Sequence, residues 1–258
     1  MPSPGADGSG AGALRPDLPD VRARLHAGAD ATVSELGERR AHPDERAAFR
    51  ASHPAPRRLD TEGGPRPRGS ALARGVLRLF GWRVRFEGGL PARQGVVIAY
   101  PHTSNWDFVW GILAKWAIGW PLTFWGKDTL FKVPVFGAWL RWLGGIPVDR
   151  TSAQGVVAQM AERLCVARDE GEFLWLALAP EGTRSATPGW RSGFYQVALQ
   201  ADVPLAIAYF DYANREVGVD SFWQLSGDRA QDIATIAQQL QGRAHGRRPG
   251  QMSPIRFL

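Results

Sequence analysis

The stretch that decides the fold lies between residues 94 and 107 and reads Gln94-Gly95-Val96-Val97-Ile98-Ala99-Tyr100-Pro101-His102-Thr103-Ser104-Asn105-Trp106-Asp107. Its first seven residues form a continuous apolar run of strand length, which is typical of a strand buried on both faces. A proline then interrupts the run, and the serine is a favourable N-cap for a helix that continues to about Gly119. The stretch therefore predicts a central strand, a loop and a helix.

Similar patterns recur between residues 70 and 241. Alternation at 83–86 predicts an edge or half-buried strand, and apolar runs predict buried strands at 173–179 and 204–209. Helices are predicted at 71–81, 134–143, 153–169, 192–201 and 229–240. Strands that alternate with helices favour an α/β protein with a central, mostly parallel or mixed sheet and helices on both faces.

Composition divides the chain into three parts. Residues 1–69 contain nine of the 19 prolines, nine of the 30 glycines and a single aromatic residue, Phe49. Such a segment cannot bury enough apolar surface to offset the loss of chain entropy. We therefore expect a disordered arm at 1–69, a folded domain at 70–241 and a basic tail at 242–258.

The positive charge is concentrated at the end of the chain. Of the net charge of +6, residues 1–69 carry +1, residues 70–241 carry +1 and residues 242–258 carry +4. The predicted domain lacks the excess charge that tracks a phosphate backbone, and no nucleic-acid-binding motif is present, so nucleic acid is not an expected partner. The tail arginines either contact anionic lipid headgroups or are simply solvated; they are Arg243, Arg247, Arg248 and Arg256.

Several features bear on membranes and compartment. Residues 108–126 are apolar, but Lys115, Gly119 and Pro121 interrupt them, and about 20 mostly apolar residues are needed to cross a bilayer. Seven tryptophans between residues 106 and 142 form either an aromatic core or an interfacial belt, and the helix at 71–81 either packs on the domain or lies on a membrane. The single Cys165 excludes an intrachain disulfide, and the N-terminus lacks the apolar core of a secretory signal. A cytoplasmic protein is expected.

His102 is the candidate proton-transfer residue, because it is the only histidine between residues 70 and 241. Asp107 follows five positions later, and the two side chains would diverge by about 140° on one regular helix. With His102 in the loop before the helix, the two come within possible reach. The alternative is a capping box from Ser104 to Asp107, in which the carboxylate only satisfies backbone amides.

Two arginines follow segments that are predicted to end at the same edge of the sheet. Arg150 comes just after the strand-like 145–148, and Arg184 comes after the predicted strand at 173–179, close to Glu181. Ligands of open α/β sheets collect outside the carboxyl ends of strands, and guanidiniums suit the bidentate capture of phosphate. Surface ion pairs, such as Glu181 with Arg184, are the alternative.

These motifs resemble the glycerolipid acyltransferases typified by bacterial lysophosphatidate acyltransferase. The His-x-x-x-x-Asp block matches His102 and Asp107, and the resemblance covers about residues 80–215. The remaining blocks resemble residues 126–137, 145–150, 181–185, which read Glu-Gly-Thr-Arg-Ser, and 203–207.

The resemblance implies an acyl transfer from a thioester, acyl-CoA or acyl carrier protein, to the hydroxyl of a lysophospholipid, with lysophosphatidate as the expected acceptor. His102 would act as general base and Asp107 would orient it. Binding of the acceptor's phosphate would involve Arg150 and Arg184, with Glu181 organising Arg184; Gly182, Thr183 and Lys127 complete the expected binding set. No cofactor or metal is expected, because no metal motif or nucleotide-binding glycine loop is present.

The resemblance also implies a peripheral position on the inner face of the cell membrane. Three other functions stay open: transfer to a lysolipid acceptor without a phosphate, lipid binding without turnover, and thioester hydrolysis. No Gly-x-Ser-x-Gly nucleophile motif is present to suggest an acyl-enzyme intermediate.

Overall fold

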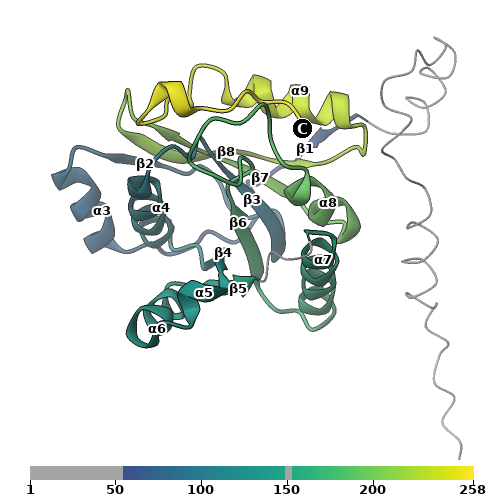
Figure 1. The fold of residues 1–258 in the computed structure, drawn as a ribbon, viewed down its shortest axis with the longest axis horizontal. Helices are drawn as coiled ribbons and strands as arrows, with labels where there is room; N and C mark the ends of the chain where they lie inside the picture. Colours follow the sequence, from purple (N-terminus) through teal and green to yellow (C-terminus); the bar gives the residue numbers. More distant parts are fainter. Residues whose placement is uncertain (1–54, 149–152) are drawn as a thin grey trace, which may run out of the picture. The chain divides into compact units, whose positions relative to one another are not determined.

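The computed structural model describes residues 55–148 and 153–258, and a mixed eight-stranded sheet forms the centre of this part (Figure 1). The strand order is β1-β8-β7-β3-β6-β4-β5, with β2 paired to β8 outside this path. The strands are β1 (Arg57–Arg58), β2 (Arg83–Arg85), β3 (Gln94–Tyr100), β4 (Leu122–Lys127), β5 (Gly145–Val148), β6 (Leu174–Leu178), β7 (Leu205–Asp211) and β8 (Glu216–Gln224).

Strand β3 lies between β6 and β7, and it is parallel to both. Strands β4 and β5 continue the parallel part of the sheet beyond β6, whereas β8 runs antiparallel to β7. The apolar run therefore becomes a central strand, as predicted, because it is buried on both faces. The predicted α/β class with a mostly parallel or mixed sheet is confirmed.

Helices cover both faces of the sheet (Figure 1). They are α3 (Ala71–Leu79), α4 (Asn105–Ile118), α5 (Asp128–Phe131), α6 (Pro134–Trp142), α7 (Ala153–Asp169), α8 (Gly193–Gln200) and α9 (Arg229–Leu240). Because side chains alternate along a strand, Val96 and Ile98 of β3 pack with α7, α8 and α9, whereas Ala99 packs on the other face with α3 and α4.

The apolar segment 108–126 divides into a helix and a strand. Helix α4 ends at Gly119, which adopts the left-handed φ of +83° that favours glycine, and β4 begins three residues later. Strand β4 was not predicted, because its apolar residues continue those of the helix. No helix in the described ranges has the length and apolarity to cross a bilayer.

Strand β8 was also not predicted. Its sequence, Glu-Val-Gly-Val-Asp-Ser-Phe-Trp-Gln, mixes polar residues with apolar ones, and its register with β7 shifts between Ile207 and Ala208. A strand with such a break lacks a regular alternation. This segment forms a strand because it pairs with β7, and not because of its own sequence pattern.

The predicted domain limits need correction at both ends. Residues 55–69 belong to the fold rather than to a disordered arm: β1 pairs with β8, and a Cβ on Gly69 would collide with the backbone of Ala117. Residues 242–258 pack on the domain rather than forming a solvated tail, since Ser253 is buried and the ring of Phe257 contacts Phe194. The rest of the predicted arm, residues 1–54, lies outside the described residues.

Candidate active site

The candidate site lies at the carboxyl end of β3. After Tyr100 the chain forms a short loop and enters α4 at Asn105, with Ser104 as the N-cap. The parallel neighbours β6 and β7 end at the same edge, so the loops after residues 178 and 211 lie beside this one. Three segments that are distant in sequence therefore meet around His102.

His102 and Asp107 lie side by side. The structure places His102 in the loop before α4, and its Nδ1 is 3.2 Å from Oδ2 of Asp107. The imidazole is 27% exposed and the carboxylate only 1% exposed. The histidine is thus open to a substrate, while its partner is sealed from solvent.

Asp107 serves as a helix cap and as the partner of histidine at once. Its Oδ2 accepts hydrogen bonds of 2.7 Å from the backbone N–H groups of Thr103 and Ser104, which forms a capping box with the Ser104 side chain. The two alternatives offered by the sequence are therefore not exclusive. Because the carboxylate oxygen accepts both of these hydrogen bonds, its orientation is fixed.

Tyr212 is a site residue that the sequence did not reveal. Its hydroxyl donates a 2.6 Å hydrogen bond to Oδ1 of Asp107, the oxygen that does not contact His102. Burial, followed by the hydrogen bond and charge of Asp107, raises the pKa of Tyr212 far above its usual range, so the phenol keeps its proton. In the sequence, the only indication of this role was the position of Tyr212 just after β7, at the edge of the sheet where the parallel strands end.

Glu181 links the loop between β3 and α4 (residues 101–104, called the histidine loop) to the C-terminal segment. Its Oε2 accepts a hydrogen bond from the backbone N–H of His102, and its Oε1 accepts one of 3.2 Å from the backbone N–H of Ser253. Burial raises the pKa of Glu181, and these hydrogen bonds oppose the rise. The alternative of an ion pair between Glu181 and Arg184 is not seen, because the carboxylate is buried and both of its oxygens accept hydrogen bonds from backbone amides.

Gly182 and Thr183 shape the turn after Glu181. Gly182 has a φ of +69°, and a Cβ there would lie 2.8 Å from the side chain of Arg191, so only glycine suits the position. The hydroxyl of Thr183 accepts a 3.4 Å hydrogen bond from the backbone N–H of Ser185. In the structure both residues form the turn that presents Arg184.

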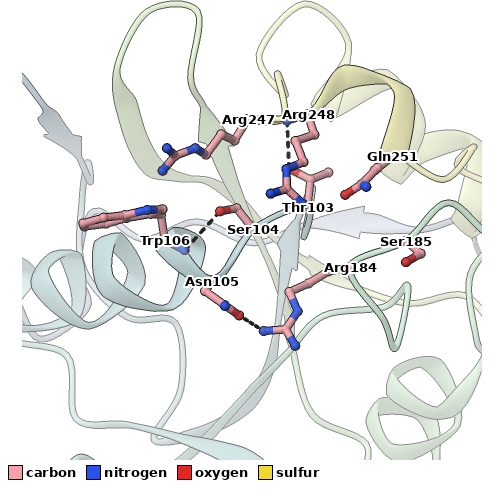
Figure 2. Close-up of a pocket in the computed structure, with 9 residues that line it drawn as sticks. All are labelled: Thr103, Ser104, Asn105, Trp106, Arg184, Ser185, Arg247, Arg248 and Gln251. Atoms are coloured by element: carbon pink, nitrogen blue, oxygen red, sulfur yellow. Dashed lines mark hydrogen bonds between the residues drawn. The ribbon is translucent and has the colours of Figure 1, made fainter.

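Arg184 borders a pocket of about 400 Å³ beside the N-terminus of α4 (Figure 2). Its Nη1 donates to Oδ1 of Asn105, which holds the guanidinium against the first turn of the helix. The pocket is lined by Thr103, Ser104, Asn105, Trp106, Arg184, Ser185, Arg247, Arg248 and Gln251. His102 and Asp107 do not line it, although the residues between them do.

The structure settles the position of one of the other two predicted cations. Lys127 ends β4, two strands away from β3, and it does not line the pocket. Arg150 lies outside the described residues; β5, which precedes it, ends at Val148. The predicted binding set is therefore not gathered in one pocket.

A second histidine joins the folded domain. Nδ1 of His245 lies 3.0 Å from Oδ1 of Asp211, so the expectation of a single imidazole in the domain is wrong. Burial acts to raise the pKa of Asp211, but hydrogen bonds from Asn214 and the nearby His245 outweigh it and lower the pKa below its usual value. The described residues thus contain two histidine–aspartate pairs, one after β3 and one at the end of its neighbour β7. Within the two described ranges, no group of three or more His, Cys, Asp or Glu side chains is arranged to hold a metal ion.

Comparisons with known proteins distinguish these two pairs. Residues 82–209 match the family model described as Acyltransferase, and this range contains His102 and Asp107 but not His245. The fold is similar to a crystal structure of the 1-acyl-sn-glycerophosphate (LPA) acyltransferase PlsC from Thermotoga maritima, with 16% identity, a TM-score of 0.46, and coverage of 67% of this chain and 78% of that one. No curated protein matches the chain.

The family match and the motif blocks agree, and both make the chain similar to acyltransferases. The reaction class of that family is the transfer of an acyl group. Within the matched range, His102 and its buried carboxylate are the pair suited to proton transfer.

Proposed function

We propose that this chain transfers a fatty acyl group from a thioester, acyl-CoA or acyl carrier protein, to the hydroxyl of a lysophospholipid, with lysophosphatidate as acceptor and phosphatidate as product. The observation that carries the proposal is the 3.2 Å approach of His102 to a buried Asp107 within the acyltransferase range. The thioester and the lysolipid supply all the reacting groups, so the proposed reaction uses no cofactor and no metal.

The proposed chemistry follows from the hydrogen bond at Nδ1. Because Asp107 accepts hydrogen bonds only, it holds the proton on Nδ1 of His102 and leaves the lone pair of Nε2 free. Nε2 removes the proton of the acceptor hydroxyl while the oxygen forms a bond to the thioester carbonyl carbon. The C–S bond then breaks, and the leaving thiolate recovers the proton from the imidazolium. A positioned general base contributes about 10² to 10⁴ in rate.

Arg184 is the proposed contact of the acceptor's phosphate among the described residues. Its guanidinium donates a hydrogen bond to Asn105, the first residue of α4, which follows the loop that contains His102. A guanidinium suits this role because its fork matches two phosphate oxygens. Arg150 and Lys127 stay candidates for the same group from the resemblance alone.

A membrane surface is the proposed location of the acceptor, on the inner face of the cell membrane. Large apolar side chains are exposed on α3, α5 and α6, including Leu72 at 78%, Val135 at 85% and Trp142 at 71%. Isolated exposed apolar residues are common, but several on neighbouring helices favour an apolar contact. Helix α4 joins these regions, because it contacts α3 and its Trp116 ring lies 5.6 Å from that of Trp142.

A panel of lysolipids with one acyl-CoA, in the presence of liposomes, tests the proposal when free thiol and lipid product are measured together. Thiol release that depends on lysophosphatidate, with an equal amount of phosphatidate, supports it. A preference for acceptors without phosphate contradicts the acceptor assignment. Thiol release without any acceptor identifies a thioesterase, and vesicle binding without thiol release identifies a lipid-binding protein.

A further inference from the structure

The C-terminal segment, residues 242–258, contributes one wall of the pocket beside α4. Arg247, Arg248 and Gln251 come from this segment, and Arg184 comes from the loop after β6 (Figure 2). The two C-terminal arginines lie outside the range that matches the acyltransferase family, which ends at residue 209. Arg247 and Arg248 therefore reach the pocket from outside the matched range.

The segment is fastened to the histidine loop at several points. The backbone N–H of Arg248 donates a 3.4 Å hydrogen bond to the hydroxyl of Thr103, and a Cβ on Gly246 would lie only 3.0 Å from the same side chain. Further along, the hydroxyl of Tyr100 donates a 2.9 Å hydrogen bond to the carbonyl of Ser253. Together with the contact of Ser253 to Glu181, these bonds fix where the two arginines enter the pocket.

Among the described residues, no carboxylate pairs with the three guanidiniums of the pocket. In the described ranges, Arg184, Arg247 and Arg248 form no ion pair, and neither aspartate nor glutamate lines the pocket. Arg184 contacts the amide oxygen of Asn105, and the guanidinium of Arg247 lies 5.5 Å from the centre of the Trp106 ring.

The arrangement favours an anion. Like charges repel one another, so a concave surface that gathers three of them has a positive potential that concentrates anions. The other tail arginines differ, since Arg243 pairs with Asp220 and Arg256 donates to the carbonyl of Pro188. Within residues 242–258, the side chains of Arg247 and Arg248 therefore differ from the other two in having no partner of this kind.

We propose that Arg247 and Arg248, together with Arg184, form a subsite for a phosphate ester. The proposal rests on the proposed acyl transfer, because that reaction brings phosphate esters to this edge of the sheet. Two sources have the required chemistry: the headgroup of the acceptor and the phosphates of coenzyme A. A pocket of about 400 Å³ holds a phosphate with its attached carbons.

Kinetics of Arg248→Ala identify the source. We expect the variant to raise KM about tenfold for the substrate that places its phosphate here, since a hydrogen bond to a charged group is of this strength. If the acceptor is the source, KM rises for lysophosphatidate but not for monoacylglycerol. If coenzyme A is the source, KM rises for acyl-CoA but not for acyl-pantetheine, which lacks the phosphates. The value of kcat should not change, and Arg248→Lys should restore part of the lost affinity.

A binding measurement separates the subsite from the reaction. Inorganic phosphate and glycerol 3-phosphate are titrated into the full chain by calorimetry, with Arg163→Ala on α7 as a control that removes one exposed positive charge. We expect Arg248→Ala and Arg247→Ala to weaken binding about tenfold, and the control to leave it unchanged. If neither KM nor binding changes in the folded arginine variants, the subsite is refuted. If phosphate binding depends on these arginines but wild type transfers no acyl group, the subsite stands and the proposed function fails.

Discussion

The histidine loop and the helices α5 and α6 differ in which side chains they expose to solvent. Around His102, the carboxylates of Asp107 and Glu181 are each 1% exposed, and all of their oxygens accept hydrogen bonds. On α6, Val135 and Trp142 are 85% and 71% exposed. The loop is held by polar contacts to three distant segments, whereas the helices present apolar side chains outward. The proposed site of proton transfer and the proposed surface for lipid contact therefore occupy different parts of the fold.

The first and largest prediction tests whether the histidine loop carries the general base. We expect His102→Ala to lower kcat by about 10² to 10⁴, because the general base is lost. Far-ultraviolet circular dichroism and thermal unfolding should match wild type, since the imidazole is partly exposed. His245→Ala is the matched control, as it removes the other histidine paired with an aspartate. Full turnover by His102→Ala would refute the assignment.

The second prediction concerns the buried hydrogen bond from Tyr212 to Asp107. We expect Tyr212→Phe to lower kcat about tenfold, because Asp107 loses a donor that fixes its orientation and a hydrogen bond to a charged group contributes about 1.5–3 kcal/mol. Tyr195→Phe is the control: it removes a 2.9 Å hydrogen bond to Asp232, another buried tyrosine–aspartate pair. Both variants should lose stability in urea unfolding. Equal kcat values in the two variants would show that the Tyr212 contact is only structural.

The third prediction concerns the exposed apolar surface. We expect Trp142→Gln to weaken binding to anionic vesicles about fivefold, because a large side chain no longer leaves water on contact. Turnover of a short-chain, water-soluble substrate should stay at the wild-type value. Val166→Gln, at an exposed apolar position of α7, is the control in a sedimentation assay. Equal vesicle binding by Trp142→Gln and wild type would argue against lipid contact by α6.

The smallest expected effect is the pH dependence of stability due to Glu181. Burial raises the pKa of Glu181, so the folded protein holds this proton more tightly than the unfolded chain. Its contribution to the free energy of unfolding is complete below the ordinary carboxyl pKa and is lost as pH rises through the raised pKa. The stability of wild type minus that of Glu181→Gln should therefore fall from pH 4 to pH 7, measured by urea unfolding. The exposed Glu170→Gln should show no such trend, and a flat difference for Glu181 would contradict the buried assignment.

Local pattern predicted the centre of the fold and the approach of His102 to Asp107. The apolar run at 94–100 became the central strand, and the placement of His102 before the helix explains its approach to Asp107. Strands β4 and β8 were not predicted, because one continues the apolar residues of a helix and the other mixes polar with apolar residues. A strand whose order comes from its partner has no reliable signal in its own sequence.

The partners of the site could not be predicted, because they depend on contacts between distant segments. Glu181 lies three residues before Arg184, yet it bonds to the backbone of His102 and Ser253 instead. The basic tail suggested a solvated segment, yet it packs beside Thr103 and supplies two arginines to the pocket. The net charge of a segment shows where basic residues lie in the sequence, but it does not show which part of the fold they contact.

The sequence by itself determined the α/β class, the position of His102 before the helix and the acyltransferase-like blocks, because each depends on the spacing of nearby residues. Only the tertiary structure decided that Tyr212 supports Asp107, that Glu181 holds the histidine loop, and that the C-terminal segment completes the pocket. The physical reason is that a buried polar group must find a hydrogen-bond partner, and the packing of the sheet decides which distant segment provides it.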